Sequence, residues 1–272
     1  MIRLVALDLD GTLFGDDLVV SPANRAAIAA AQARGVHVTL ATGRMFRSAR
    51  VHAAALDITT PLICYQGALV QDPVTEEVLF HRPVAQALAL EVIALLEEWG
   101  LYPNVYLNDK LYTSELNPGT AYYSHVNGDL PIHPVGDLAA FLRQEGGDPT
   151  KLSTVLGNEE RTERTVAMLH AHFGERIYAV KSHPRFAETV NPHCDKGVAL
   201  AMLADHLGIA QEQTLAIGDG SNDLALLRWA GIGVAMGQAH PEVHAHADYV
   251  TRTLAEDGVA AALERFVLAP VG

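Results

Sequence analysis

Two carboxylates follow the first apolar segment of the chain. The stretch 2–9 is apolar at nearly every position, as in a parallel strand buried on both faces. Asp8 and Asp10 lie at its carboxyl end. Side chains two residues apart in a strand point the same way, so we expect both carboxylates at the carboxyl edge of a sheet, where open α/β sheets bind ligands. Gly11 would allow a sharp turn and a close approach of the backbone to an anion. Taken alone, Asp-x-Asp is more typical of a pair of turn and cap carboxylates than of an active site.

A phosphate cradle is predicted after the next strand, at 36–41. Thr42 offers a hydroxyl, Gly43 a backbone N–H at the opening of a helix, and Arg44 a guanidinium, which together could bind phosphate. Lys196 opens a later helix, and a point cation there could hold both a nucleophilic carboxylate and a phosphate. Alone, the first group reads as an ordinary helix cap and the lysine as a surface charge.

A last acidic group follows the strand predicted at 214–217. Asp219 should stand at the same carboxyl edge, with Asn222 and Asp223 about one helical turn further on. The glycines around it match neither a P-loop, nor a nucleophile elbow, nor a dinucleotide-binding fingerprint.

The elements that position these residues alternate between strand and helix at both ends of the chain. A Ser21-Pro22 helix start and a Gly35 stop place one helix between the first two strands. Between 83 and 188, hairpins mix with helices, and turn-forming residues dominate 117–149. We therefore predict an α/β fold: a doubly wound, Rossmann-like parallel-sheet core from residues 1–82 and 189–272, with an inserted α+β domain at 83–188.

Composition limits the possible partners and compartments. The chain has 272 residues, 49% of them hydrophobic, and 19 basic against 32 acidic residues give a net charge of −13, which argues against binding to a nucleic-acid backbone. We expect no signal peptide, and no membrane span either, because no uninterrupted apolar run of about 18 residues occurs. Two distant cysteines fit a reducing, cytoplasmic location. Nothing in the sequence indicates an oligomeric state.

The four groups in this order resemble the haloacid-dehalogenase-like (HAD) superfamily. The resemblance rests on Asp8-Leu9-Asp10-Gly11-Thr12-Leu13, Thr42-Gly43-Arg44, Lys196 and Gly218-Asp219-x-x-Asn222-Asp223. The segment between the second and third groups resembles the cap insertion of the Cof-type branch. Gln66 and Gln238 depart from the asparagines common at those places, which bears on substrate detail. The resemblance spans essentially the whole chain.

The resemblance implies a magnesium-dependent phosphatase that acts on a small phosphorylated metabolite. Asp8 would be the nucleophile and Asp10 the general acid and base, while Thr42, Gly43 and Lys196 would bind phosphoryl oxygens. Gly11, Arg44 and Asn222 complete the expected phosphate-binding set. Mg²⁺ would be held by Asp8, Asp10 through its backbone carbonyl, Asp219 and Asp223, the last through water or by orienting the site.

Alternatives stay open at this point. A phosphomutase would return the phosphoryl group from Asp8 to a second hydroxyl, and a non-catalytic protein would only bind a phosphorylated metabolite. His240, His244 and His246 offer a weaker metal hypothesis, and His125 and His133 in the insertion could touch substrate. The phosphate ester itself is not predicted; sugar phosphates, nucleotides and cofactor phosphates all fit.

Overall fold

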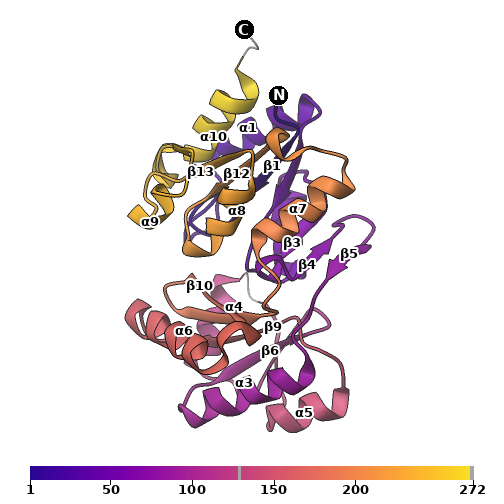
Figure 1. The fold of residues 1–272 in the computed structure, drawn as a ribbon, viewed down its shortest axis with the longest axis vertical. Helices are drawn as coiled ribbons and strands as arrows, with labels where there is room; N and C mark the ends of the chain where they lie inside the picture. Colours follow the sequence, from indigo (N-terminus) through magenta and orange to yellow (C-terminus); the bar gives the residue numbers. More distant parts are fainter. Residues whose placement is uncertain (128–129, 270–272) are drawn as a thin grey trace. The chain divides into compact units, whose positions relative to one another are not determined.

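The structure is a computed structural model that describes residues 1–127 and 130–269 (Figure 1). The chain divides into two compact units. The core unit comprises Met1–Phe80 and the chain from Asp195 on, and the inserted unit comprises His81–Cys194. The chain therefore leaves the core unit once and returns to it once.

A five-stranded parallel sheet forms the centre of the core unit, in the order β14-β13-β12-β1-β2. Its strands are β1 (Leu4–Leu7), β2 (His37–Leu40), β12 (Thr214–Gly218), β13 (Ile232–Ala235) and β14 (Tyr249–Val250). Leu7 lies opposite Leu40 on one side and Ile217 on the other. All four residues of β1 are buried, which explains the unbroken apolar sequence of this strand.

Helices cover this sheet. They are α1 (Pro22–Ala33), α2 (Phe46–Ala55), α7 (Lys196–His206), α8 (Leu224–Trp229), α9 (Pro241–His244) and α10 (Gly258–Leu263). Leu4 and Ala6 belong to one apolar cluster with α7 and α8, which lie side by side (Figure 1). Val5 and Leu7 point to the opposite face and are equally buried, and α1 packs against α10. The predicted doubly wound α/β core is therefore confirmed.

A small antiparallel sheet extends the core unit, in the order β3 (Leu62–Cys64), β4 (Leu69–Gln71) and β5 (Val78–His81). Strands β4 and β5 are neighbours in this sheet. Short 3-10 turns and one π-helical turn complete the described chain: η1 (Tyr65–Gly67), η2 (Gly174–Arg176), η3 (Gln211–Gln213), η4 (Ser221–Asp223), η5 (Leu254–Glu256) and the π turn η6 (Glu264–Leu268). No helix in residues 1–127 and 130–269 combines the length and the apolar character that a membrane span needs.

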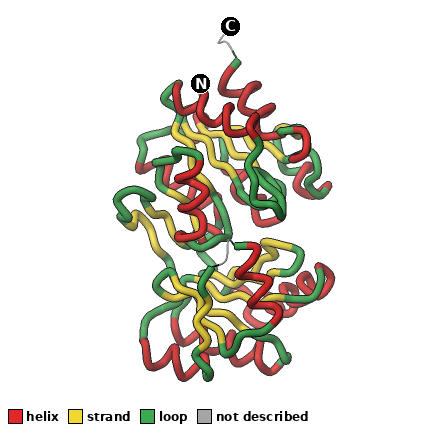
Figure 2. Tube along the Cα trace, turned by 180° about the vertical axis from the view of Figure 1, so that it is seen from behind, coloured by secondary structure: helices red, strands yellow, loops and turns green. Residues whose placement is uncertain are grey.

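The inserted unit holds a six-stranded sheet in the order β10-β11-β9-β6-β7-β8. Figure 2 shows strands in yellow and helices in red. Its elements are α3 (Gln86–Glu98), β6 (Pro103–Leu107), β7 (Lys110–Thr113), α4 (Pro118–Val126), β8 (Ile132–Pro134), α5 (Leu138–Glu145), β9 (Lys151–Val155), α6 (Glu159–Phe173), β10 (Tyr178–His183) and β11 (Phe186–Val190). Val105 and Leu152 pack with α3, α5 and α6 on one face of the sheet. Tyr106 points to the other face, where its ring contacts Tyr123 of α4.

Three sequence predictions need correction here. The turn-rich interpretation of 117–149 was wrong, because this segment contains α4 and α5; its turn formers Asn117 and Asp137 are N-caps whose side chains accept backbone N–H groups. Strand β11 was not predicted. The expected boundary at 188/189 would cut through β11, and the compact inserted unit continues to Cys194.

The two ends of the inserted unit lie next to each other. The Arg82 guanidinium donates to the His193 carbonyl at 2.8 Å, and the Asn191 amide donates to the Pro83 carbonyl at 2.8 Å. The Cys194 thiol lies 3.7 Å from the Arg82 carbonyl. The two segments of chain at the ends of the inserted unit are thus joined by hydrogen bonds from side chains to backbone carbonyls.

Candidate active site

The end of β1 carries the first pair of carboxylates. The Asp8 N–H donates to the Ile217 carbonyl at 3.0 Å, which continues the parallel ladder to the edge of the sheet. Gly11 then turns the chain with φ at +87°, a conformation that side chains other than glycine disfavour. A Cβ atom at Gly11 would lie 2.3 Å from Asp219 Oδ2, so the absence of a side chain lets this turn approach the loop after β12.

Lys196 is buried between two carboxylates. Its Nζ donates to Asp8 Oδ1 and to Asp223 Oδ1, at 2.6 Å each, and the lysine is 1% exposed. The position follows from the start of α7, where the Asp195 side chain caps the helix by accepting from the Val198 N–H at 2.7 Å. The sequence predicted that Lys196 would matter only among the carboxylates, and the structure places it there.

The loop after β12 is organised by Asp223. Its Oδ2 accepts from the backbone N–H groups of Asp219 and Gly220, at 3.0 Å each, while its Oδ1 accepts from Lys196. Asp219 is partly exposed, and its Oδ1 accepts from the Thr12 hydroxyl at 2.9 Å. Asp223 therefore fixes the loop, whereas Asp219 accepts a side-chain hydrogen bond through one of its carboxylate oxygens only. Thr12 belongs to the first motif, but its contact with Asp219 was not predicted from the sequence.

The electrostatics of this cluster favour an additional positive charge. Burial, together with the nearby Asp223 carboxylate, raises the pKa of Asp8 well above its ordinary value, although Lys196 acts in the opposite direction. Burial and Asp223 also raise the pKa of Asp219, to about 7. Burial alone would lower the pKa of Lys196, but Asp223 and Asp8 outweigh it and raise that pKa. A single lysine thus compensates only part of the negative charge.

The cluster fits a divalent cation. Asp8, Asp219 and Asp223 each offer a carboxylate oxygen, and these oxygens lie within 4.8 Å of one another. Within the described chain, no donor is hydrogen-bonded to Oδ2 of Asp8 or of Asp219. Carboxylate oxygens are the ligands that Mg²⁺ prefers, together with water and phosphate oxygens. Both oxygens of Asp223 already accept hydrogen bonds, so it is better suited to orient the site than to bind the ion directly.

Arg44 contacts the second carboxylate of the first motif, Asp10. The guanidinium forms a bidentate pair with Asp10, with Nη2–Oδ1 at 2.6 Å and Nε–Oδ2 at 2.8 Å, and lies over the Phe14 ring. The Arg44 N–H also donates to the Thr42 hydroxyl at 3.1 Å. Arg44 is 5% exposed. The structure shows that this arginine holds the second carboxylate, and its binding to phosphate stays a prediction.

A neutral histidine adjoins this pair. Burial and the Arg44 guanidinium lower the pKa of His52 to about 4, so the ring adds no charge beside Asp10 at neutral pH. The ring packs against Phe14, with the centroids 4.7 Å apart. His52 lies about one turn before the end of α2, and its place beside Asp10 was not predicted from the sequence.

Two glutamines link loops of the site. Gln66 is fully buried, and its Oε1 accepts from the Asn222 amide at 3.1 Å. Tyr65 and Gln66 both have positive φ, 52° and 59°, in the tight turn η1. The Gln238 amide donates to the Gly11 carbonyl at 2.6 Å. The sequence singled out both glutamines as unusual but did not predict these contacts.

The histidine hypothesis is not supported. His244 Nε2 lies 3.0 Å from the Met236 carbonyl, His246 Nδ1 lies 2.8 Å from the Glu242 carbonyl, and His240 Nδ1 accepts from the Glu242 N–H. Across residues 1–127 and 130–269, the one cluster with suitable metal-ligating atoms is that of Asp8, Asp219 and Asp223.

The site is thus an acidic cluster around a buried lysine, at the carboxyl edge of a doubly wound parallel sheet. The model of the haloacid dehalogenase-like hydrolases matches residues 5–263. The chain belongs to this family.

Individual relatives match over nearly the whole chain. It is 32% identical to the putative phosphatase YxeH of Bacillus subtilis, covering 99% of this chain and 100% of that protein. It is 30% identical to the 5-amino-6-(5-phospho-D-ribitylamino)uracil phosphatase YcsE of the same organism, over 98% of this chain and 96% of that protein. The solved structure of the HAD subclass IIB sugar phosphatase BT4131 matches with a TM-score of 0.82 at 25% identity, over 97% of this chain and 98% of that one.

Proposed function

We propose that the protein is a magnesium-dependent phosphatase that hydrolyses small phosphate monoesters through a phospho-aspartate on Asp8. The observation that carries this proposal is the environment of Asp8. Lys196 fixes one oxygen of this buried carboxylate, and the other oxygen accepts no hydrogen bond from the described residues. An oriented carboxylate of this kind can act as a covalent nucleophile.

The reaction would proceed in two steps. Asp8 attacks phosphorus, the ester P–O bond breaks, and the leaving alkoxide takes a proton from Asp10. A water molecule then attacks the phosphorus of the phospho-enzyme and gives a proton to Asp10, while the bond to Asp8 breaks and inorganic phosphate leaves. Asp10 is returned to its protonated form, so atoms and protons balance.

Arg44 would control the position of Asp10. The bidentate pair holds the carboxylate in one orientation. Asp10 must therefore weaken this pair when it carries the proton for the leaving group. Arg44 is in this view a positioning residue, and its place beside Asp10 suits the second step, in which Asp10 accepts a proton.

Lys196 and the loop after β2 would bind the phosphoryl group. The Thr42 hydroxyl oxygen accepts from the Arg44 N–H, which leaves the hydroxyl proton available to donate. Together with the Gly43 N–H and the Lys196 ammonium, it would stabilise charge on the phosphoryl oxygens. Gly11 would let the backbone approach the substrate, and Asn222, placed by Gln66, would support Lys196 or the phosphate.

Mg²⁺ would be held by Asp8, Asp219 and the backbone carbonyl of Asp10, with Asp223 orienting the loop. The bound ion would neutralise negative charge on the carboxylates and on the phosphoryl group. The raised pKa values of Asp8 and Asp219 support this proposal, because an extra cation lets both carboxylates ionise.

The proposed substrate is a small phosphorylated metabolite. The related proteins named above act, by their names, on a ribitylamino-uracil phosphate and on sugar phosphates. The inserted unit would act as the cap that selects the ester. A cytoplasmic location is proposed on two cysteines that form no disulfide.

Turnover of a phosphate-ester panel tests the proposal. Purified protein should release inorganic phosphate from some esters with Mg²⁺, lose this activity in EDTA and regain it when Mg²⁺ is restored. Labelled phosphate appearing on a second hydroxyl of the substrate would instead indicate a mutase. Ligand binding without any turnover across the panel would contradict the enzymatic proposal.

A further inference from the structure

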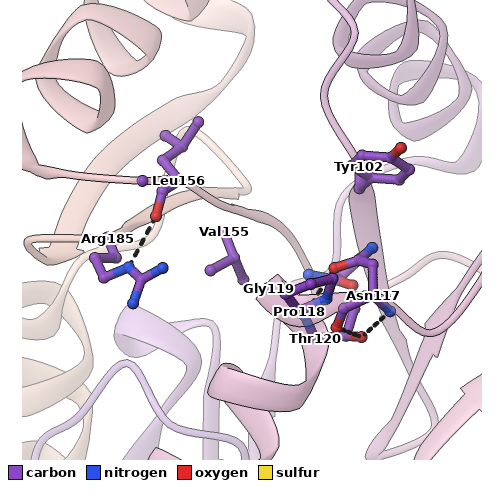
Figure 3. A pocket seen from close by; sticks show the side chains of 10 residues that line it. Tyr102, Asn117, Pro118, Gly119, Thr120, Val155, Leu156 and Arg185 are labelled. Carbon is purple, nitrogen blue, oxygen red and sulfur yellow. Dashed lines mark hydrogen bonds between the residues drawn. The ribbon is translucent and has the colours of Figure 1, made fainter.

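The inserted unit contains a cavity of about 270 Å³ on the sheet face that carries Tyr106. It lies at the ends of β6 and β9, beneath the first turn of α4 (Figure 3). Arg185 stands on one side, the first residues of α4 and Tyr102 stand on the other, and Val155 lies between them (Figure 3). All the lining residues belong to the inserted unit.

Arg185 brings an incompletely used cation to the cavity. Its Nε donates to the Leu156 carbonyl at 3.0 Å, and the guanidinium lies 4.1 Å from the centre of the Tyr122 ring. Both contacts hold the side chain in place. No acceptor within residues 1–127 and 130–269 is hydrogen-bonded to its two terminal nitrogens. A fixed guanidinium with available N–H groups is suited to a carboxylate or phosphate group.

The start of α4 adds to the positive potential. This helix of nine residues begins with Asn117 as N-cap and Pro118 at its first position. A Cβ at Gly119 would lie 3.3 Å from Val155 Cβ, so glycine lets the helix start sit close to β9. The partial positive charge of the helix N-terminus is therefore brought against the cavity that Arg185 enters.

Unpaired amides provide an independent observation. Asn104 lines the cavity and is 1% exposed; its Nδ2 is 3.4 Å from Ser153 Oγ, and its Oδ1 has no partner in the described chain. The Asn117 amide nitrogen is likewise buried without a partner. Buried amide atoms without hydrogen bonds are costly, so each calls for an explanation. Both residues line the cavity, so the Asn104 oxygen could accept from a ligand hydroxyl or amino group, and the Asn117 amide nitrogen could donate to a ligand oxygen.

We infer that this cavity binds a small organic anion that carries hydroxyl or amino groups. The anionic group would lie at Arg185 and the helix start, and the donor groups would reach the Asn104 oxygen. The volume suits a molecule of roughly six carbons, near the lower end of ligand pockets. The inference does not depend on the proposed phosphatase activity.

Ligand-observed saturation-transfer NMR tests this inference with the full chain. The probe is D-gluconate; D-glucitol lacks its charge, and hexanoate lacks its hydroxyls. Gluconate should bind saturably, at least about tenfold tighter than either comparison compound, since each of them loses one class of hydrogen bond. Arg185→Gln and Asn104→Leu should each weaken gluconate binding about tenfold or more, and Arg185→Lys should weaken it less than Arg185→Gln.

Two controls separate this result from other effects. Arg143→Gln makes the same substitution on the exposed surface of α5 and should leave binding unchanged. Asp8→Asn changes the core unit and should also leave gluconate binding unchanged. The inference is overturned if gluconate shows no saturable binding up to about 10 mM. It is equally overturned if the comparison compounds bind as well, or if folded Arg185→Gln binds like the wild type.

A parallel kinetic measurement distinguishes two sources of such an anion. If the anion is part of the phosphate ester, Arg185→Gln should raise KM for esters that carry a carboxylate and leave p-nitrophenyl phosphate unchanged. If the anion is a separate metabolite, KM should be unchanged for every ester, while gluconate binding is still lost.

Discussion

Asp10 accepts two hydrogen bonds from Arg44 and is proposed to act as general acid and then as general base. Esters whose leaving groups differ in their need for a proton therefore test the acid role. Asp10→Asn should lower kcat for alkyl phosphates by about 100-fold to 10,000-fold, because the departing alkoxide loses its acid. The loss should be smaller for p-nitrophenyl phosphate in the first step, since nitrophenolate leaves without a proton. Single-turnover release of the alcohol and of nitrophenol measures this difference, because it isolates the first step. Equal losses in single-turnover release of the two alcohols would contradict the acid role.

Asp219 should make the stability of the metal-free protein depend on pH. Its pKa is raised from 3.8 to about 7 in the folded state, so the folded protein holds this proton more tightly than the unfolded chain. The resulting stabilisation is present below pH 4 and disappears as the pH rises through about 7. In EDTA, Asp219→Asn should therefore become more stable than the wild type as the pH rises from 4 to 8, by a few kcal/mol at most.

Thermal unfolding across this pH range provides the measurement. Adding Mg²⁺ at pH 8 should raise the Tm of the wild type and leave that of Asp219→Asn nearly unchanged. A wild-type Tm that does not respond to Mg²⁺, or a stability difference that is flat with pH, would count against the proposed charge cluster.

At the residue scale, the sequence predicted which side chains gather but not all of their pairings. Asp8, Lys196, Asp219 and Asp223 follow strand ends or helix starts, and backbone direction alone brings them to one edge. Arg44 was assigned to phosphate because a positive charge beside a cradle suggests an anion. Which anion it meets depends on the rotamers of Arg44 and Asp10, and local sequence does not encode these.

The turn after β1 can approach the loop after β12 closely because residue 11 is a glycine. A Cβ there would overlap Asp219, and the positive φ adds strain, so Gly11→Ala should displace Asp219 and abolish most of the activity. Gly35→Ala is a matched control: its φ is +77°, but no atom lies within 4 Å of the added Cβ. Both variants should lose about 1 kcal/mol or more of stability. Only Gly11→Ala should lose activity and Mg²⁺ response, as measured by turnover and thermal unfolding; equal activity of the two variants would refute this.

At the element scale, the prediction was best where one signal decided the structure. The start of α7 at Lys196 and that of α1 at Pro22 follow from their caps, Asp195 and Ser21. α4 and α5 were missed because Asn, Asp, Pro and Gly serve both as turn formers and as helix caps. Their helical character depends on tertiary packing, such as that of Leu142 in the apolar cluster of the inserted unit.

The whole molecule is divided into units whose connection is simple. Replacing residues 84–190 by a short Gly/Ser linker keeps Arg82 and His193, and the contact between Asn191 and Pro83 shows that a short linker can span the gap. The remaining core should fold and respond to Mg²⁺. If the inserted unit selects the ester, kcat/KM for the best ester of the panel should fall far more than that for p-nitrophenyl phosphate.

Circular dichroism and the ester panel measure these outcomes. An unfolded core would refute the division into independent units. A folded core that keeps the full ranking and rates of the panel would show that the inserted unit does not set specificity.

The proposed phosphatase mechanism depends on the covalent step at Asp8. The direct measurement is a rapid acid quench during turnover, followed by proteolysis and mass spectrometry of the peptide that contains Asp8. The mechanism predicts a phosphoryl group on Asp8 in the wild type. It predicts no such adduct and no turnover in Asp8→Asn, although that variant keeps its fold. A folded Asp8→Asn protein with substantial activity, or a phosphoryl group trapped on another residue, would contradict it.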